Sequence, residues 1–353
     1  MKHIFVVHSN ITYLISLGVI RKEGLNESDV MIISDGFTCD GPIPVTVVKV
    51  EANKAIWKQS VKRYIKLFYN PWYELYQVID AFVRDEAFIA YVPVLHLIKK
   101  LVIIHPKCTE FHFIEEGTAS YMYTATLADY SIAASENKHW IYPKGITGLK
   151  QRFHHSYREF GFKTNVIGTI PLYYMNHDKL GRKFYGFREE AHPALHFGER
   201  EVIDMKSILR DFNFPNDIYE FKNANIWIGD PDVEKMYGED IYLKCLQNKL
   251  IPAVEGSTLY VRYHYRENKF QRQKFVSLLE KHGVKYTEID DKQIMELVFI
   301  KSTGCKCYGF MSSLLMYATM AGHASFSIAD GNSPMRKYVE EVIPCFSKFV
   351  TYL

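Results

Sequence analysis

Short apolar runs that end in polar residues and a turn alternate with helical patterns along the first third of the chain. The apolar runs predict buried strands at residues 4–7, 31–34, 45–50, 88–92 and 111–114. Apolar residues recur at helical spacing at 13–20, 55–83 and 94–104, with a break expected at Asn70 and Pro71 because proline cannot continue a helix. Strands that alternate with helices predict a parallel sheet covered by helices.

The second half of the chain repeats this alternation, with strands predicted at 224–228, 258–263 and 284–286, and helices at 240–248, 272–281 and 314–321. Between the halves, residues 144–200 are rich in His, Arg and aromatic residues and show weak periodicity. Such a segment is either an insertion that binds a ligand near a cleft or a surface excursion with a linker. We expect an α/β protein with two Rossmann-like domains, at 1–200 and 201–333, and a C-terminal helix at 334–353 that crosses back to the first domain.

The composition argues against several classes of protein function. The 353 residues suffice for two domains of ordinary size, and a formal net charge of +3 is too small to indicate non-specific binding of nucleic acid. The six cysteines show neither a repeated CxxC pattern nor zinc spacing with histidines, so we predict reduced thiols, no metal site and a cytoplasmic protein. The first apolar run is too short for a signal peptide or a membrane span. The lysine-rich, aromatic helix at 55–69 leaves peripheral contact with a membrane as a minor hypothesis beside an ordinary solvated helix.

Two adjacent acids, Glu115 and Glu116, directly follow the apolar run 111–114 and precede Gly117. Ligands of open α/β sheets bind at the carboxyl ends of the strands, so acids at this point lie where chemistry usually occurs. We predict that one of the two is a general base. On its own, such a pair is more often a helix cap or a partner of an arginine.

Polar residues also follow two predicted strands of the second half. His264 lies just past the apolar part of 258–263, and Ser312 and Ser313 open the helix 314–321, where backbone N–H groups favour a phosphate. Each feature alone has a plain structural explanation, as a partly buried histidine or as helix-start serines. Their order along the chain, together with the acid pair, points to one site divided between the two domains.

The ordered set resembles the motifs of bacterial sialyltransferases that carry a D/E-D/E-G motif, an HP motif and a downstream serine motif. These include the lipooligosaccharide sialyltransferases and the capsule polysialyltransferases. The resemblance covers most of the chain in order and spacing. It implies the GT-B arrangement, in which two Rossmann-like domains face a central cleft, and a sugar donor activated by cytidine monophosphate (CMP).

The resemblance also implies roles for individual residues. Glu115 or Glu116 corresponds to the base, with Glu116 favoured, and His264 to a residue that stabilises the leaving phosphate. The residues implied in donor binding are Gly229, Pro231, His264, Glu296, Ser312 and Ser313. Weaker candidates for binding the acceptor are Ser9, Asn10, Gly117, Arg152 and His155. The chain departs from the pattern at Tyr265, where the family has a proline that would bias the preceding histidine toward an extended backbone.

The leading expectation is an inverting sialyltransferase that moves sialic acid from CMP-sialic acid to a hydroxyl group of a galactose-terminated glycan, without a metal or other cofactor. Its partners would be the CMP-sugar donor and an oligosaccharide or glycolipid acceptor of lipopolysaccharide or capsule biosynthesis. A transferase for another CMP-linked acidic sugar, such as Kdo, is one alternative, and a non-catalytic glycan- or membrane-binding protein is another. A glycoside hydrolase fits poorly, because its carboxylates must flank the scissile bond at roughly 5 to 10 Å.

Overall fold

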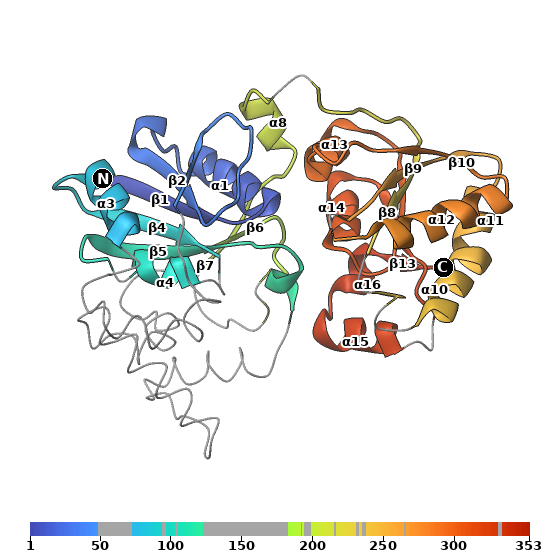
Figure 1. Ribbon diagram of the computed structural model, residues 1–353. Coiled ribbons are helices and arrows are strands. Elements are labelled where there is room, and N and C mark those ends of the chain that lie inside the picture. The colour runs from blue at the N-terminus through green and yellow to red at the C-terminus, as the bar shows by residue number, and fades with distance from the viewer. Residues whose placement is uncertain are drawn as a thin grey trace, which may run out of the picture. The chain divides into compact units, whose positions relative to one another are not determined.

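The computed structural model describes residues 1–48, 73–93, 97–103, 105–122, 183–191, 193, 199–214, 217–230, 233–234, 238–264, 266–330 and 334–353 (Figure 1). The chain divides into two compact units. The first contains Met1–Glu116 and Thr124–Ile203, and the second contains Gly117–Tyr123 and Asp204–Leu353. The main division therefore falls between Ile203 and Asp204, and the short segment that follows the acid pair clusters with the second unit.

In the described residues, the first unit is built on a seven-stranded sheet with the order β3-β2-β1-β4-β5-β6-β7, in which all neighbours are parallel. The strands are β1 (Lys2–Val7), β2 (Val30–Ser34), β3 (Val45–Val47), β4 (Phe88–Val92), β5 (Cys108–Ile114), β6 (Lys183–Gly186) and β7 (Glu199–Val202). The helices are α1 (Asn10–Lys22), the short 3-10 helix η1 (Glu27–Asp29), α3 (Tyr73–Val83) and α4 (Leu97–Ile103). The strand order reverses direction between β1 and β4, which makes the carboxyl ends around this point the usual place for a ligand.

Helices cover both faces of this sheet (Figure 1). Ile4 and Val6 of β1 pack with Leu75 of α3 and Leu101 of α4 in one buried cluster. The alternate residue Phe5 is also fully buried, and α1 packs against β1, β5 and β6. Burial on both faces explains why the strands read as continuous apolar runs rather than as an alternation.

In the described residues, the second unit has a six-stranded parallel sheet with the order β10-β9-β8-β11-β12-β13. Its strands are β8 (Asn225–Ile228), β9 (Thr258–Arg262), β10 (Lys285–Glu288), β11 (Lys306–Gly309), β12 (Ala324–Ser327) and β13 (Thr351–Tyr352). The order reverses between β8 and β11. A Cβ atom on Gly309 would lie 2.9 Å from the carbonyl oxygen of Ile228, so the close approach of the two strands requires glycine.

The helices of the second unit connect and cover these strands. They are η2 (Thr118–Tyr121, 3-10), α8 (Ser207–Asp211), α10 (Glu239–Cys245), the π-helical η3 (Leu246–Leu250), α11 (Ile251–Val254), α12 (Lys269–Lys281), α13 (Met295–Lys301), α14 (Ser313–Ala321), α15 (Pro334–Val342) and α16 (Phe346–Phe349). Among them, α14 packs against β11 and β12, and α12 packs against β10. No helix in the described part of the chain is long and apolar enough to cross a membrane.

The predicted α/β class with two Rossmann-like domains is confirmed, because each unit is an α/β domain with a parallel sheet. The predicted break at Asn70 and Pro71, the helix at 55–69 and most of the segment 144–200 lie outside the described residues. The prediction that 144–200 is irregular was wrong for β6 and β7, which are strands of the first sheet. β7 is the edge strand and is polar, so its sequence carries no apolar run that would reveal it.

The prediction of one C-terminal helix at 334–353 was also wrong. The tail contains α15, α16 and β13, and β13 pairs with β12 in the sheet of the second unit. Pro344 explains the break after α15, because a residue that precedes proline is disfavoured in helical conformation. The tail thus completes the second sheet as its edge strand.

Candidate functional site

The two adjacent acids lie in different surroundings. Glu115 has no exposed surface, and its Oε2 accepts the N–H of Phe187 at 2.7 Å. Its own N–H donates to the carbonyl oxygen of Tyr185 at 2.9 Å. These bonds connect the end of β5 to Tyr185 of β6 and to Phe187, which follows β6. Glu115 therefore has a structural role.

The side chain of Glu116 is only 5% exposed and lies between two basic groups. The Nζ atom of Lys99, on α4, is 2.9 Å from Glu116 Oε2, and the side chain of Lys99 has no exposed surface. The Nε2 atom of His8, which follows β1, lies 4.0 Å from the same oxygen. A carboxylate, a buried ammonium group and a quarter-exposed imidazole thus meet at the carboxyl ends of β1 and β5.

The start of α1 holds His8 in place. The N–H of His8 donates to Thr12 Oγ1 at 2.9 Å, and Thr12 and the N-cap residue Ser9 form a reciprocal capping box. The hydroxyl of Ser9 accepts the N–H of Thr12 at 3.4 Å, so it satisfies the helix end. Asn10 is the first residue of α1, and Gly117, with φ of +94°, turns the chain after Glu116 in a conformation that favours glycine.

In the second unit, His264 belongs to a tight turn after β9. Its carbonyl oxygen accepts the N–H of Glu267 at 2.9 Å, and its Nδ1 accepts the N–H of Arg266 at 3.2 Å. A ring nitrogen that accepts a backbone N–H carries no proton, so this contact assigns the proton of the neutral ring to Nε2. His264 can therefore donate from Nε2.

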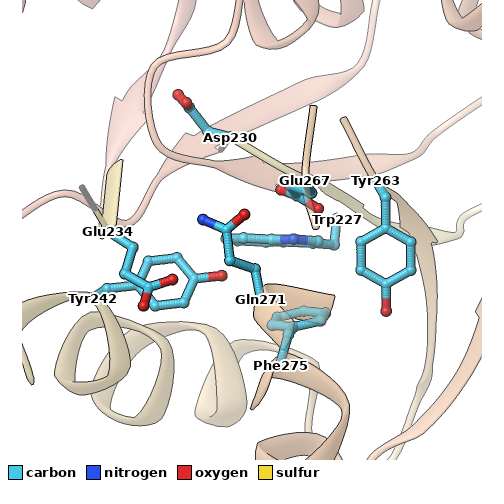
Figure 2. A pocket seen from close by; sticks show the side chains of 8 residues that line it. All are labelled: Trp227, Asp230, Glu234, Tyr242, Tyr263, Glu267, Gln271 and Phe275. Carbon is cyan, nitrogen blue, oxygen red and sulfur yellow. The ribbon is translucent and has the colours of Figure 1, made fainter. Parts of the chain in front are cut away.

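A small hollow adjoins this turn (Figure 2). It is lined by Trp227, Asp230, Glu234, Tyr242, Tyr263, Glu267, Gln271 and Phe275. Figure 2 shows the carboxyl group of Glu267 over the indole ring of Trp227. Burial raises the pKa of Glu267 to about 7, while Arg272 opposes this shift and Asp230 adds to it. In the described residues, no three His, Cys, Asp or Glu side chains are grouped as metal ligands would be.

The two serines lie at the carboxyl end of β11. Ser312 is the N-cap of α14, and its hydroxyl accepts the N–H of Leu314 at 3.3 Å. Ser313 is the first residue of the helix, and both serines are half-buried. The first turn of α14 therefore presents backbone N–H groups and two hydroxyls at the point where the strand order reverses.

Glu296 is buried in the first turn of α13. Burial raises its pKa to about 6, and the positive charge of Arg262 partly offsets this shift. Arg262, the last residue of β9, donates to the carbonyl oxygen of Asp290 at 2.8 Å and to Asp291 Oδ1 at 3.1 Å.

The structure brings Ser9, Asn10, Glu115 and Glu116 to one edge of the first sheet, the carboxyl ends of β1 and β5, and Gly117 is the next residue in the chain. In the second unit, Gly229, His264, Ser312 and Ser313 follow the carboxyl ends of β8, β9 and β11. Pro231, Tyr265, Arg152 and His155 lie outside the described residues. A single site that joins the two sets stays a prediction.

Sequence reasoning missed His8, Lys99 and Glu267 as members of these groups. His8 carries the same signal as the acid pair, a polar residue directly after an apolar strand, and could have been found in that way. Lys99 and Glu267 carry no such signal. Lys99 is identified by its ion pair with Glu116 and Glu267 by its burial, and both features arise only in the folded protein.

No protein-family model and no curated protein sequence matches the chain. Among solved structures, a sialyltransferase from Photobacterium damsela is 10% identical and matches 100% of this chain and 81% of its own, with a TM-score of 0.48. MurG from Acinetobacter baumannii is 11% identical, with 100% and 85% covered and a TM-score of 0.38. The UDP-GlcNAc 2-epimerase from Methanocaldococcus jannaschii is 11% identical, with 100% and 89% covered and a TM-score of 0.45. These similarities do not decide an activity, which has to be argued from the residues of the site.

Proposed function

We propose that the protein is an inverting sialyltransferase that transfers sialic acid from CMP-sialic acid to a hydroxyl group of a galactose-terminated glycan. The observation that carries this proposal is the position of the motif residues in two Rossmann-like sheets. Glu116 follows β5, His264 follows β9 and Ser312 follows β11, each at the carboxyl end of its strand. Ligands of such sheets bind at these ends.

On the acceptor side, the carboxylate of Glu116 accepts the proton of the attacking hydroxyl group. The acceptor oxygen forms a bond to the anomeric carbon as the bond from that carbon to the phosphate oxygen breaks, which inverts the configuration. Lys99 holds the carboxylate through its 2.9 Å contact, and His8 Nε2, at 4.0 Å, is a second basic group near the same proton. Glu116 takes this role rather than Glu115, whose carboxylate is fully buried and bonded to the N–H of Phe187.

On the donor side, the phosphate of CMP gains negative charge as it leaves. His264 would donate to it from Nε2, and Ser312, Ser313 and the N–H groups at the start of α14 would surround it with further donors. Glu296 would accept hydrogen bonds from the ribose hydroxyls, and Gly229 and Pro231, which follow β8 in the chain, would contact the nucleotide. In this mechanism the phosphate charge is met by protein donors, and no metal or other cofactor takes part.

A transferase for another CMP-linked acidic sugar, such as Kdo, is the second candidate. In the proposed site His264, Ser312 and Ser313 would all contact the phosphate and none of them would select the sugar, so the same residues would serve this donor. The natural acceptor in either case is an oligosaccharide or glycolipid, and we place the enzyme in the cytoplasm or at the inner face of the membrane. A non-catalytic glycan- or membrane-binding protein is the alternative outside the enzymes.

A donor screen tests the proposal. Purified protein is incubated in EDTA with CMP-sialic acid, CMP-Kdo or UDP-N-acetylglucosamine and with a set of galactosides, and CMP release and products are measured by mass spectrometry. We expect CMP release and a sialylated galactoside. Turnover of the UDP-sugar alone, or no release of CMP from either donor, would refute the proposal.

Variants then test the mechanism. Glu116→Gln removes the proton acceptor at nearly unchanged volume and should lower kcat by about 10²- to 10⁴-fold. Glu234→Gln is the matched control, because Glu234 is a partly exposed acid paired with Lys274 at 2.7 Å and is given no role in the reaction. Equal activity of the two variants would contradict the role of Glu116.

A further inference from the structure

A second hollow of the second unit lies at the amino ends of β8 and β9. It is lined by residues 220–225 and 257–258 and by Tyr260, and its volume is about 300 Å³. This volume is at the lower end of the range for ligand pockets, about 300–1,000 Å³. The hollow beside Trp227 has a volume of about 10 Å³, which is enough for one water molecule. We call the larger one the amino-edge hollow.

The amino-edge hollow is separate from the groups assigned to the nucleotide. Asn225 and Thr258, the first residues of β8 and β9, line it, whereas His264 and Ser312 follow the carboxyl ends of β9 and β11. The strands β8 and β9 are four and five residues long, so at about 3.3 Å a residue their two ends are about 10–13 Å apart. A ligand in this hollow would therefore occupy a site of its own.

The wall that precedes β8 is held by hydrogen bonds to the segment before β11. The N–H of Phe221 donates to Ser302 Oγ at 2.9 Å, and its carbonyl oxygen accepts the N–H of Thr303 at 2.9 Å. The N–H of Asn223 donates to the carbonyl oxygen of Thr303 at 2.9 Å. A wall ordered in this way loses little entropy when a ligand binds, because its conformation is already set.

Two aromatic residues line the hollow. The ring centroids of Phe221 and Tyr260 are 4.6 Å apart, and the ring planes are tilted by 48°. Both residues are half-buried, so each keeps surface in contact with solvent. One face of a sugar ring carries apolar C–H groups, and these pack on aromatic rings, whose negative faces attract the weakly positive hydrogens. Phe221 and Tyr260 can therefore receive such a face.

The amide group of Asn225 is oriented by two hydrogen bonds. The hydroxyl of Ser257 donates to the carbonyl oxygen of Val254 at 2.6 Å, so it accepts from Asn225 Nδ2 at 2.8 Å. The hydroxyl of Tyr308 donates to Asn225 Oδ1 at 3.4 Å. Nδ2 has a second hydrogen and Oδ1 has a second lone pair. A donor and an acceptor held side by side match two neighbouring hydroxyl groups of a sugar.

The charges around the hollow do not select an ion. Among the described residues that line it, Glu220 and Lys222 carry charge, and they are exposed and opposite in sign. An anion would meet the carboxylate and a cation would meet the ammonium group. The hollow therefore favours a neutral ligand.

We propose that the amino-edge hollow is an accessory carbohydrate-binding site that takes one neutral hexose unit of a glycan. The apolar face of the sugar packs on Phe221 and Tyr260, and two of its hydroxyl groups bond to the amide of Asn225. This inference does not depend on the proposed function, because none of these residues takes part in the transfer.

Fluorine NMR of the full chain tests the site directly. Protein labelled with 3-fluorotyrosine is titrated with galactose, glucose and N-acetylglucosamine, and the Tyr260 signal is assigned by its loss in Tyr260→Phe. We expect this signal to shift with at least one sugar and to saturate with a Kd of about 1–10 mM, because ligands of about a dozen non-hydrogen atoms bind weakly. The signal of Tyr286 on β10, which does not line the hollow, is assigned in the same way and should stay in place. If none of the three sugars shifts the Tyr260 signal saturably up to about 100 mM, the proposal is overturned.

Variants of the labelled protein test the two contacts. Phe221→Leu removes one ring and should raise the Kd about 10-fold, and Asn225→Asp removes the amide donor and should raise it about 2- to 10-fold. Phe270→Leu is the matched control for the first, because Phe270 is 64% exposed on α12 and does not line the hollow, and it should leave the Kd unchanged. Thermal unfolding shows that each variant is folded. An unchanged Kd in either of the first two variants would overturn the role of that residue.

Titration with CMP separates this site from the proposed active site. CMP should leave the Tyr260 signal in place, and a saturable shift of this signal by CMP would overturn carbohydrate as the ligand class. Failure of the protein to release CMP from CMP-sialic acid would refute the proposed function and leave the result of the sugar titration as it stands.

Discussion

Replacing Lys99 with methionine removes the cation from a carboxylate that water scarcely reaches. Lys99 Nζ lies 2.9 Å from Glu116 Oε2, and the two side chains are 0% and 5% exposed. Methionine fills most of the space of the lysine stem, so the main consequence is a buried charge without its ammonium partner. Breaking such a pair from one side costs about 3–5 kcal/mol. We therefore expect Lys99→Met to lower the free energy of unfolding of the first unit by that amount.

The assay must report on the first unit alone, because a chain of two domains need not unfold in one step. Hydrogen exchange of peptides that cover β5, measured in increasing urea, gives the free energy of opening at the acid pair. Lys107→Met is the control, since Lys107 Nζ lies 2.7 Å from Asp80 Oδ1 but the two side chains are 35% and 51% exposed. Such an exposed pair contributes less than about 1 kcal/mol.

A double variant tests whether the unpaired charge of Glu116 causes the loss of stability. In Lys99→Met with Glu116→Leu both charges are gone, and stability should return to within about 1 kcal/mol of the unmodified protein, since apolar replacements of both partners are often neutral. The reasoning is refuted if Lys99→Met costs no more than Lys107→Met. It is also refuted if the double variant is as unstable as Lys99→Met alone.

Further predictions concern the second unit. The pKa of Glu267 is raised from 4.5 to about 7, so the folded state binds an extra proton between these values and stability falls as pH rises from about 4.5 to about 7. This decline in the free energy of unfolding amounts to about 3 kcal/mol at most. Urea unfolding of the unmodified protein and of Glu267→Gln at pH 5 and pH 8 should show a smaller decline in the variant. An equal decline in the two proteins would contradict the assignment of the raised pKa to Glu267. Gly229→Ala should cost about 1–3 kcal/mol through its clash with Glu267, and Glu267→Ala should relieve that cost; additive losses in the same unfolding assay would argue against the contact. Ser312→Ala removes the cap of α14 and should cost about 1 kcal/mol, together with about a 10-fold loss of CMP affinity by calorimetry; unchanged affinity would remove Ser312 from the phosphate site.

The interior strands β1, β2, β4, β5 and β8 could be predicted from the sequence because they are buried almost throughout and read as apolar runs. The interior strands β6, β11 and β12 were missed, because each is four residues long and contains lysine, glycine or serine. β1 and β5 are examples, in which the last four residues are all buried. The edge strands β7 and β13 could not be predicted, because one side of an edge strand has no partner and its residues can be polar. The same reason explains why the tail was taken for a helix, since the two residues of β13 acquire their conformation from pairing with β12.

The acid pair shows where prediction of the site stops. A polar residue after a buried strand identifies the edge of the sheet but not which of two neighbours turns inward. Glu115 turns toward the N–H of Phe187, a residue 72 positions later, and Glu116 turns toward Lys99, 17 positions earlier. Both partners are brought near β5 only by the packing of the fold. The choice between the two acids therefore depends on contacts that no local pattern contains.

The same limit applies to the residues that hold the motif in place. Lys99 stands in an apolar helical stretch and reads as part of a solvated face, yet α4 packs against β5 and buries its ammonium group completely. Glu267 precedes the helix cap at Asn268 and reads as a turn residue, yet its carboxyl group occupies the space beside Gly229, at the end of β8. In the first unit, the motif residue Glu116 is thus paired with the charged side chain of Lys99, which restrains it. Substitution of the motif residues alone would measure the reacting groups, whereas substitution of Lys99 would measure how the fold holds one of them.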